Sequence, residues 1–280
     1  MSVKEGLVFL SDTRTNAGVD HVSTFRKMTV FEQPGERVLV MLSAGNLALT
    51  QSVLQLLTES APPGQPTLWT VPNLYEGARV IGGAVREVYK LHALALQDFG
   101  VEFNCSFLLG GQIHGHPPRL FQVYAAGNFI EVSTVNPYFQ IGEAKYGKPI
   151  IDRVLTPDTP LAEAAKCALI SMDSTLRSNV SVGLPLDLLV YERDSLRVTR
   201  FAQLDSENQY FQMIHGTWGE RLRQVFSEIP DPEWAAADTV PVSGRRVATA
   251  PRVAVPVTAD GVAPPQPDVP QQILAQPPPA

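Results

Sequence analysis

Near the start of the chain, apolar and polar residues alternate in a pattern that predicts a β-strand over residues 6–12. Val8, Leu10 and Asp12 share one face of that strand, so a carboxylate ends an otherwise apolar stripe. The Lys-Glu-Gly sequence that leads into it is typical of a tight turn, because Gly accepts the positive φ that hairpin connections need. Only residues 1–3 are available for the strand before that turn, which is shorter than a usual strand. We therefore expect the chain to begin inside its first hairpin.

Further along the chain, the pattern predicts strands in clusters and helices in pairs between them. Apolar runs separated by turn signals predict strands at residues 25–31, 37–42, 102–109, 120–125, 129–133, 186–192 and 197–203. Apolar residues at helical spacing predict helices at residues 46–59, 73–99, 145–155, 159–177 and 207–229. This order is typical of an α+β fold in which two antiparallel sheets are faced by layers of helices.

Caps and turn residues set the expected boundaries of these elements. Asn46 and Thr159 are predicted to be N-cap residues, and Pro149 is expected to interrupt the third helix. Gly110-Gly111 and Gly127-Asn128 are predicted to be turns between strands, because glycine and asparagine favour such positions. These signals divide the central part of the chain into short strands joined by loops.

The composition changes near the C-terminus. Residues 238–280 are rich in Pro, Ala, Val and Gln, have few charges, and are predicted to form a disordered or polyproline-like tail. This tail would be either a docking segment or a dispensable extension. Residues 1–237 are predicted to form one domain, because a chain of this length can bury a substantial single core.

Charge and cysteine usage narrow the classes of function. The net charge of -6 and the lack of a dense Lys/Arg run argue against a nucleic-acid partner. No apolar stretch reaches the roughly 18–20 residues that cross a bilayer, and no signal-peptide pattern opens the chain. We therefore expect no membrane partner and a cytoplasmic location. Cys105 and Cys167 are isolated, without CxxC spacing, which indicates neither a metal site nor a disulfide. No Walker, GxGxxG or HExxH motif is present, so no cofactor is expected.

Asp12 and Lys27 are the first candidates for chemistry. An Asp at the end of a strand often binds its own turn, so Asp12 alone is a weak signal. In strand alternation Lys27 shares a face with Phe25, Thr29 and Phe31, which would draw its ammonium into the interior. A buried ammonium needs an acidic partner, and Asp12 on a neighbouring strand is the nearest candidate. The two would form either a structural ion pair or a catalytic one.

Two groups of small polar residues are weaker candidates. Residues 43–46 (Ser-Ala-Gly-Asn) join a strand to a helix. Backbone N–H groups at such a junction can stabilise an oxyanion, or the small residues can simply fit a tight turn. Ser178 and Ser181 follow the fourth predicted helix and would either orient an active site or bond the local loop. His114 and His116 lie in a Gly/Pro loop without further ligands, which is typical of a solvated loop.

Taken together, several segments resemble the proteasome-like peptidases, in particular the bacterial group called Anbu, the "ancestral beta subunit". They are Ser-Asp-Thr-Arg-Thr-Asn-Ala-Gly, Phe-Arg-Lys, Ser-Ala-Gly-Asn-Leu-Ala and Arg-Ser-Asn-Val-Ser-Val-Gly, at residues 11–18, 25–27, 43–48 and 177–183. Residues 109–112 and 140–149 are similar to that group as well, and the resemblance spans roughly residues 5–235. It implies a four-layer αββα sandwich of the N-terminal-nucleophile hydrolase type. In such enzymes the first residue, usually Thr, attacks the substrate, and its own amine is the base.

The resemblance also implies roles for particular residues. Asp12 matches the acid of the family, Lys27 the lysine that lowers the proton affinity of the nucleophile, and Gly45 the backbone donor to the oxyanion. Ser178 and Ser181 occupy the family's Asp and Ser positions near the terminal amine. Ser178 therefore departs from the acid found in proteasomes. These five positions are the expected catalytic residues.

The nucleophile itself is the largest departure. Relatives place it about sixteen residues before the acid that Asp12 matches, and this chain has only eleven residues there. Ser2 is a poor substitute, because an offset of about five residues displaces a hydroxyl by about 16 Å, whereas reaction tolerates about 1 Å. Ala144 also stands where relatives tend to have Ser. We therefore expect no nucleophile in the chain as written, with the first strand truncated by a late start assignment.

Three functions remain compatible with this resemblance. The first is a threonine-type peptidase whose nucleophile-bearing first strand precedes Met1. The second is a catalytically inactive, self-assembling ring or scaffold subunit. The third is an N-terminal-nucleophile amidase that acts on a non-peptide amide. The partners that the resemblance implies are further copies of the same chain, in a ring or spiral, and a peptide or protein substrate.

Overall fold

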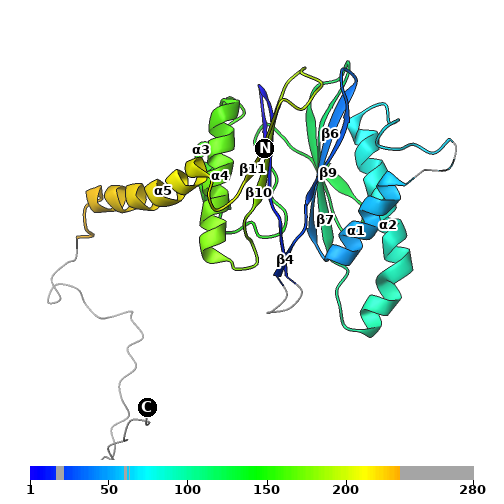
Figure 1. The fold of residues 1–280 in the computed structure, drawn as a ribbon, viewed down its shortest axis with the longest axis horizontal. Helices are drawn as coiled ribbons and strands as arrows, with labels where there is room; N and C mark the ends of the chain where they lie inside the picture. The colour runs from blue at the N-terminus through cyan, green and yellow to red at the C-terminus, as the bar shows by residue number, and fades with distance from the viewer. Residues whose placement is uncertain (17–21, 60–61, 63, 234–280) are drawn as a thin grey trace, which may run out of the picture. The chain divides into compact units, whose positions relative to one another are not determined.

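Two antiparallel sheets lie face to face in the middle of the molecule (Figure 1). The four-stranded sheet has the order β1-β2-β10-β11, formed by Ser2–Val3, Gly6–Asp12, Leu186–Glu192 and Arg200–Leu204. The five-stranded sheet has the order β5-β6-β7-β8-β9, formed by Met28–Gln33, Arg37–Gly45, Cys105–Ile113, Arg119–Val123 and Phe129–Glu131. Strands β3 (Arg14–Asn16) and β4 (Val22–Thr24) form a separate small hairpin.

The computed structural model describes residues 1–16, 22–59, 62 and 64–233. The residues Met1–Ile229 form one compact unit by their contacts. The tail predicted at residues 238–280 lies outside the described residues. Among the helices described, none is both long enough and apolar enough to span a membrane.

Helices cover the outer face of each sheet. Helices α1 (Leu47–Thr58) and α2 (Leu74–Asp98) lie on the five-stranded sheet, and α3 (Lys148–Val154) and α4 (Leu161–Ser178) lie on the four-stranded sheet (Figure 1). Helix α5 (Gln209–Glu228) packs against α4. The order of layers is helices, sheet, sheet, helices, which confirms the predicted α+β fold and its αββα sandwich.

Alternate residues of each inner strand enter different layers of the core. In β2, Leu7 and Phe9 pack between the two sheets, whereas Val8 and Leu10 pack against α3 and α4. The β6 strand is buried on both faces, as its continuous apolar run predicts. The alternation in β2 therefore brings Asp12, two residues after Leu10, to the end of the stripe that faces the helices.

The start of α4 differs from the prediction, whereas the start of α1 agrees with it. The N-cap predicted at Asn46 is confirmed, because its side chain accepts hydrogen bonds from two backbone N–H groups in the first turn of α1. Thr159 does not cap α4. Its hydroxyl accepts a hydrogen bond from the backbone N–H of Thr156 at 2.9 Å. The carboxylate of Glu5 instead accepts one from Leu161 N, at 3.0 Å. A residue on the β1–β2 turn thus supplies the cap, and no local pattern reveals it.

Gly110 and Gly111 lie inside β7, so the prediction of a turn at these residues is wrong. A Cβ at Gly110 would lie 2.7 Å from the ring of Phe9, and a Cβ at Gly111 would lie 2.0 Å from the carbonyl oxygen of Val38. The glycines are present because the two sheets and a neighbouring strand approach closely here. Pro149, expected to interrupt its helix, instead lies in the first turn of α3, where proline is well tolerated.

The predicted strand at residues 25–31 begins too early. Residues 25–27 form an irregular segment, and β5 begins at Met28. The backbone N–H of Phe25 donates to the carbonyl of Thr13 at 2.7 Å, which ties this segment to the end of β2. Lys27 is placed by that contact, by its own ion pair, and by a hydrogen bond from Ser43 N on β6 to its carbonyl oxygen at 3.0 Å.

Gly110→Ala is expected to destabilise the protein by about 2 kcal/mol, because the added methyl group overpacks the space between Gly110 and Phe9. Gly83→Ala in α2 is the matched control. A Cβ at Gly83 meets nothing within 4 Å, and Ala favours helix by about 1 kcal/mol over Gly, so stability should be unchanged or raised. Urea denaturation measures both values. A Gly110→Ala variant as stable as the natural chain would contradict the close packing.

Candidate active site

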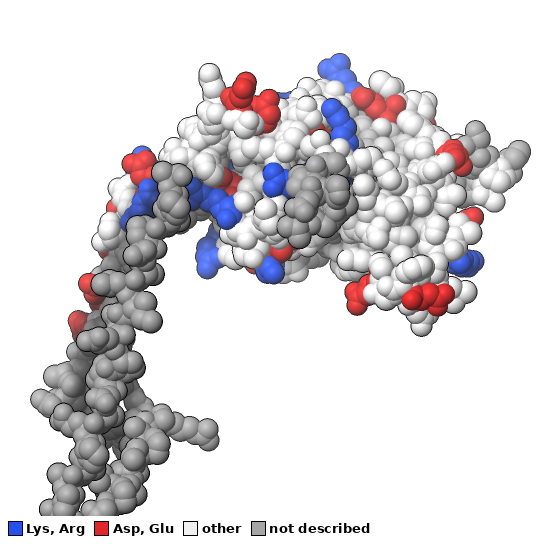
Figure 2. All heavy atoms as spheres, turned by 60° about the horizontal axis from the view of Figure 1, so that its bottom comes forward, with Lys and Arg blue, Asp and Glu red and all other residues white. Residues whose placement is uncertain are grey.

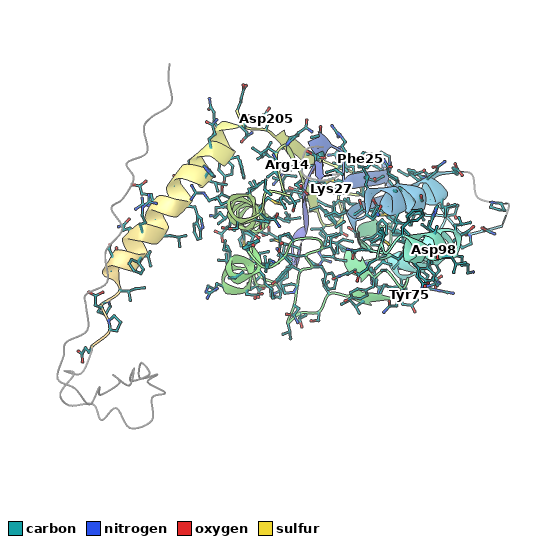
Figure 3. The ribbon with its side chains drawn as sticks, turned by 90° about the horizontal axis from the view of Figure 1, so that it is seen from below. Arg14, Phe25, Lys27, Tyr75, Asp98 and Asp205 are labelled. Atoms are coloured by element: carbon teal, nitrogen blue, oxygen red, sulfur yellow. The ribbon has the colours of Figure 1, made fainter. Side chains whose placement is uncertain are left out.

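A cleft of about 630 Å³ opens beside the ends of β2 and β6. Segments far apart in the sequence meet in its walls, which are formed by parts of β2, β6 and α4 and by residues 25, 27, 139–143, 181 and 182. Arg14, Phe25 and Lys27 lie close together at this part of the molecule (Figure 3). Four of the five expected catalytic residues line the cleft: Asp12, Lys27, Gly45 and Ser181.

Asp12 and Lys27 form the ion pair that their positions in the sequence suggest. The Lys27 ammonium donates to Asp12 Oδ1 at 2.7 Å. The other carboxylate oxygen, Oδ2, accepts backbone hydrogen bonds from Arg14 at 3.2 Å and Gly183 at 3.3 Å. The side chain of Asp12 is 11% exposed and that of Lys27 is 24% exposed. The carboxylate is therefore fixed from both sides, and it holds a partly exposed ammonium at the wall of the cleft.

Gly45 ends β6 where the chain turns toward α1. Its φ is +112°, and a Cβ at this position would lie 2.4 Å from the carbonyl oxygen of Asn104. Only glycine fits this conformation and this close approach. Gly45 lines the cleft, and the next residue, Asn46, is the N-cap of α1. The N-terminus of α1 therefore lies at this wall. Because Asn46 Oδ1 already accepts from Ala48 N and Leu49 N in that first turn, the group here that could hold a developing negative charge is the backbone N–H of Gly45 itself.

Ser181 belongs to a hydrogen-bonded chain that the sequence does not reveal. The hydroxyl of Ser181 donates to Asn179 Oδ1 at 2.7 Å, and Asn179 Nδ2 donates to Glu143 Oε2 at 2.8 Å. Glu143 also lines the cleft. Asn179 and Glu143 fall within segments that resemble the family, but nothing in the local sequence of either residue indicates that the two side chains meet. Ser178, in contrast, is exposed and is not part of the cleft wall.

The cleft combines apolar side chains with buried oxygen atoms that lack partners. Thr15 Oγ1 and Gln140 Oε1 are buried and accept or donate no hydrogen bond within the described part of the chain. Phe25, Leu47 and Phe139 supply apolar surface to the same walls. An extended peptide matches both properties, because its backbone offers N–H groups and its side chains offer apolar surface.

One backbone edge of β2 borders the cleft. Met1 and Val8 exchange two hydrogen bonds, from the Met1 amine to Val8 O at 2.8 Å and from Val8 N to Met1 O at 3.0 Å. Backbone groups alternate in direction along a strand, so those of Leu10 and Asp12 face the same side as those of Val8. On that side, β1 is the partner of β2 in the described residues, and its pairing ends at Met1. Burial lowers the pKa of the Met1 amine from 8.0 to about 5.

Comparison with solved structures gives strong matches to one group of proteins. Anbu (ancestral beta-subunit) from Yersinia bercovieri is 54% identical with a TM-score of 0.77, and the match covers 84% of this chain and 98% of that one. The Anbu (Gly-1) mutant from Hyphomicrobium sp. strain MC1 is 52% identical with a TM-score of 0.77, covering 83% and 96%. A helical assembly of the Anbu complex from Pseudomonas aeruginosa is 47% identical with a TM-score of 0.79, covering 83% and 96%.

Among curated proteins, proteasome subunit beta 2 from Pyrobaculum calidifontis is similar to this chain. It is 25% identical over 198 residues, which cover 70% of this chain and 89% of that protein. No family model matches the chain.

Proposed function

Because the chain belongs to the Anbu (ancestral beta-subunit) family of proteasome-like proteins, we propose that it is a peptidase with a threonine nucleophile on strand residues that precede Met1. Membership of this family supports a hydrolase of the peptidase class. The identity and position of the nucleophile are our proposal. A cytoplasmic location and a peptide or protein substrate are part of it.

The observation that carries this proposal is the position of the cleft. It runs along the edge of β2, directly beyond the point where the pairing of β1 with β2 ends. In antiparallel pairing, each residue added before Met1 would advance one position along β2, by about 3.3 Å. About four added residues would reach the level of Asp12, and a fifth, at the level of Thr13, would bring the first of them toward Lys27. The ion pair at the end of that line supports an N-terminal nucleophile at this point.

In the proposed reaction, the hydroxyl oxygen of the terminal threonine attacks the carbonyl carbon of the peptide bond. Its proton passes to the free amine of the same residue and from there to the leaving nitrogen, as the C–O bond forms and the C–N bond breaks. Water then hydrolyses the resulting ester. The Lys27 ammonium, held by Asp12, would stabilise the charge that develops on the hydroxyl oxygen. A backbone N–H at Gly45 would donate to the oxyanion.

Glu143 would take the role of the acid that proteasomes have at the position of Ser178. Since Asn179 donates to Glu143, its carbonyl oxygen is turned toward Ser181 and accepts the Ser181 hydroxyl proton. The lone pairs of the Ser181 oxygen would then be available to a terminal ammonium in the cleft. Glu143 would act through this chain as a positioning residue, because it touches neither of the bonds that change.

The test compares the chain that begins at Met1 with two extended chains. Each extension carries about five residues of the natural upstream coding sequence, beginning with threonine in one chain and with alanine in the other. We expect hydrolysis of fluorogenic peptides, and an ester adduct with a β-lactone inhibitor in the intact mass, for the threonine form alone. The intact mass of the protein from its own cells shows whether such an extension exists. Equal activity of the alanine form would contradict the proposal. A native mass equal to that of a chain beginning at Met1 or Ser2 would contradict it as well.

Stability gives a second readout that does not depend on activity. The unfolded chain that begins at Met1 binds a proton on its amine below pH 8, whereas the folded chain binds it only below about pH 5. Its stability should therefore rise as the pH increases from 5 to 8. An extended chain has a peptide bond at Met1 and should lack this rise. Thermal denaturation at both pH values measures the difference.

We further propose that copies of the chain associate with one another, as in the helical assembly solved for the Pseudomonas aeruginosa relative. Association would also serve the alternative function of a catalytically inactive scaffold subunit. Inactivity of every extended form, with association intact, would favour that alternative.

A further inference from the structure

A second pocket, of about 340 Å³, opens between the two sheets beside the edge strand β5. One wall is formed by β5, and the other is formed by β10, β11 and the loop that joins them. The residues that line this pocket are all different from those that line the candidate active site. The roles proposed for the cleft therefore do not account for it.

Asp187 on β10 places a buried carboxylate in this pocket. Asp187 is only 1% exposed, and it shares a strand face with Leu189, which packs in the core between the sheets. Oδ1 accepts a hydrogen bond from Gln203 Nε2 at 3.3 Å. Oδ2 is buried and has no hydrogen-bond partner within the described part of the chain. A buried carboxylate oxygen without a partner is unfavourable, so this position is suited to a hydrogen-bond donor from a ligand.

Ser11 on β2 presents a second unpartnered oxygen beside Asp187. The two residues are directly opposite each other in the antiparallel pairing of β2 with β10, so their side chains lie on the same face of the sheet. Ser11 Oγ is also buried and, among the residues described, has no hydrogen-bond partner. The Cβ atoms of directly opposite residues are about 5 Å apart. A single ammonium group, which has three N–H donors, can therefore reach both oxygens.

The charges of the pocket favour one added monovalent cation. Its lining contains two acids, Asp187 and Glu32, and one base, Arg26. Glu32 Oε1 already accepts a hydrogen bond from Val198 N at 2.7 Å, which ties the loop before β11 to β5. Arg26 is exposed and lies at the rim. One monovalent cation at Asp187 would balance the total charge of these three side chains.

The remaining walls of the pocket favour an organic cation over a metal ion. They are apolar and are formed by Met28, Val30, Leu189, Val198 and Phe201. Calcium and magnesium ions need about six or more oxygen ligands. Among the described residues, no group of three or more His, Cys, Asp or Glu side chains is placed to hold a metal ion. An alkyl chain that ends in an ammonium group matches both the carboxylate and the apolar walls.

Charge elsewhere on the surface is mixed. On the face of the molecule that Figure 2 shows, acidic and basic side chains are scattered among uncharged ones. That face as a whole would attract a cation only weakly, so selective binding requires a structured site such as this pocket.

We propose that this pocket binds a primary ammonium group carried on an apolar chain, with the ammonium between Asp187 Oδ2 and Ser11 Oγ. The apolar chain packs along Leu189 and Phe201 and extends toward the rim. Two sources share this chemistry, a free small amine and the lysine side chain of another polypeptide. The inference does not depend on whether the cleft cleaves peptides, because the two sites have separate walls.

Isothermal titration calorimetry of the full chain with n-butylammonium chloride tests this site at constant ionic strength. We expect saturable binding at one site. Tetramethylammonium has the same charge but no N–H donor, and it should bind at least about tenfold more weakly. Asp187→Asn keeps the shape of the side chain but removes its charge, and it should raise the Kd for butylammonium at least about tenfold.

Two further variants separate loss of the site from loss of the fold. Asp98→Asn is the matched control, because Asp98 is exposed at the end of α2, outside the pocket (Figure 3), and its Kd should be unchanged. Phe201 is 46% exposed, so Phe201→Ala should keep the fold while it removes part of the apolar wall. It should raise the Kd about threefold.

The peptide acetyl-Gly-Lys-Gly-amide distinguishes the two sources of the ammonium group. A Kd within about threefold of that for butylammonium would identify a lysine side chain as the occupant, and a Kd at least about tenfold higher would identify a free amine. Lack of saturable butylammonium binding to the natural chain up to about 100 mM would overturn the inference. Equal affinities of the natural chain and Asp187→Asn, or of butylammonium and tetramethylammonium, would overturn it as well.

Discussion

Lys27→Met is expected to lower kcat for peptide hydrolysis by at least about a thousandfold in the form of the protein that carries the nucleophile. The ammonium of Lys27 lies in the cleft wall and, among the residues that the structure describes, is the one cation paired with Asp12, at 2.7 Å. Methionine keeps the length of the side chain but removes the charge that would stabilise the nucleophile oxygen. Stability should change little, about 1 kcal/mol, because Asp12 keeps its two backbone donors. Steady-state kinetics with a fluorogenic peptide and urea denaturation measure the two effects.

Lys4→Met is the matched control for this substitution. Lys4 is ion-paired with Asp158, but both side chains are largely exposed, at 73% and 70%. Exposed pairs of this kind contribute little to stability, and Lys4 does not line the cleft, so activity and stability should stay close to those of the natural chain. Full activity of Lys27→Met would show that the Asp12–Lys27 pair is structural. A loss of activity together with a large loss of folding stability would also show that the pair is structural.

The sequence alone predicts those parts of the fold and site that neighbouring residues encode. The alternation from Val8 to Asp12 places the carboxylate at the end of β2, because side-chain direction in a strand follows directly from residue number. Asn46 caps α1 because its side chain bonds the backbone of its own turn. The Asp12–Lys27 contact is reached by reasoning about charge, since an ammonium drawn toward the interior requires an acid close by.

Other features depend on contacts between distant segments, and no local pattern contains them. The cap of α4 comes from Glu5, which is far from α4 in the chain and near it only once β2 is in place. Gly110 has the composition of a turn, but it serves close packing against Phe9 from the opposite sheet. The chain of hydrogen bonds from Glu143 to Ser181 joins two loops whose proximity is set by the packing of α4 on β2. In each case the residue type would also fit a local role, but the residue's actual role depends on contacts with segments that are distant in the chain.

Gln112→Leu is expected to destabilise the fold by about 4 kcal/mol, the largest loss of stability among the substitutions considered. Gln112 on β7 is only 3% exposed and uses its whole amide group. Its oxygen accepts from the Tyr191 hydroxyl at 2.7 Å and from Asp194 N at 2.8 Å. Its nitrogen donates to His116 O at 2.7 Å and to Asp194 Oδ1 at 2.6 Å. The bonds with Tyr191 and Asp194 connect the five-stranded sheet with β10 and with the loop that joins β10 to β11.

Leucine would leave several of these buried polar groups without a partner, and each such group costs about 1–3 kcal/mol. The matched control is Gln122→Leu on the adjacent strand β8. Gln122 is half-buried and forms no side-chain hydrogen bond within the residues described, so its replacement should change stability by no more than about 0.5 kcal/mol. Urea denaturation of the two variants isolates the contribution of the amide contacts from that of a Gln-to-Leu change in itself. Equal stabilities would mean that water satisfies the groups around Gln112, and that the two sheets are held together by apolar packing without this connection.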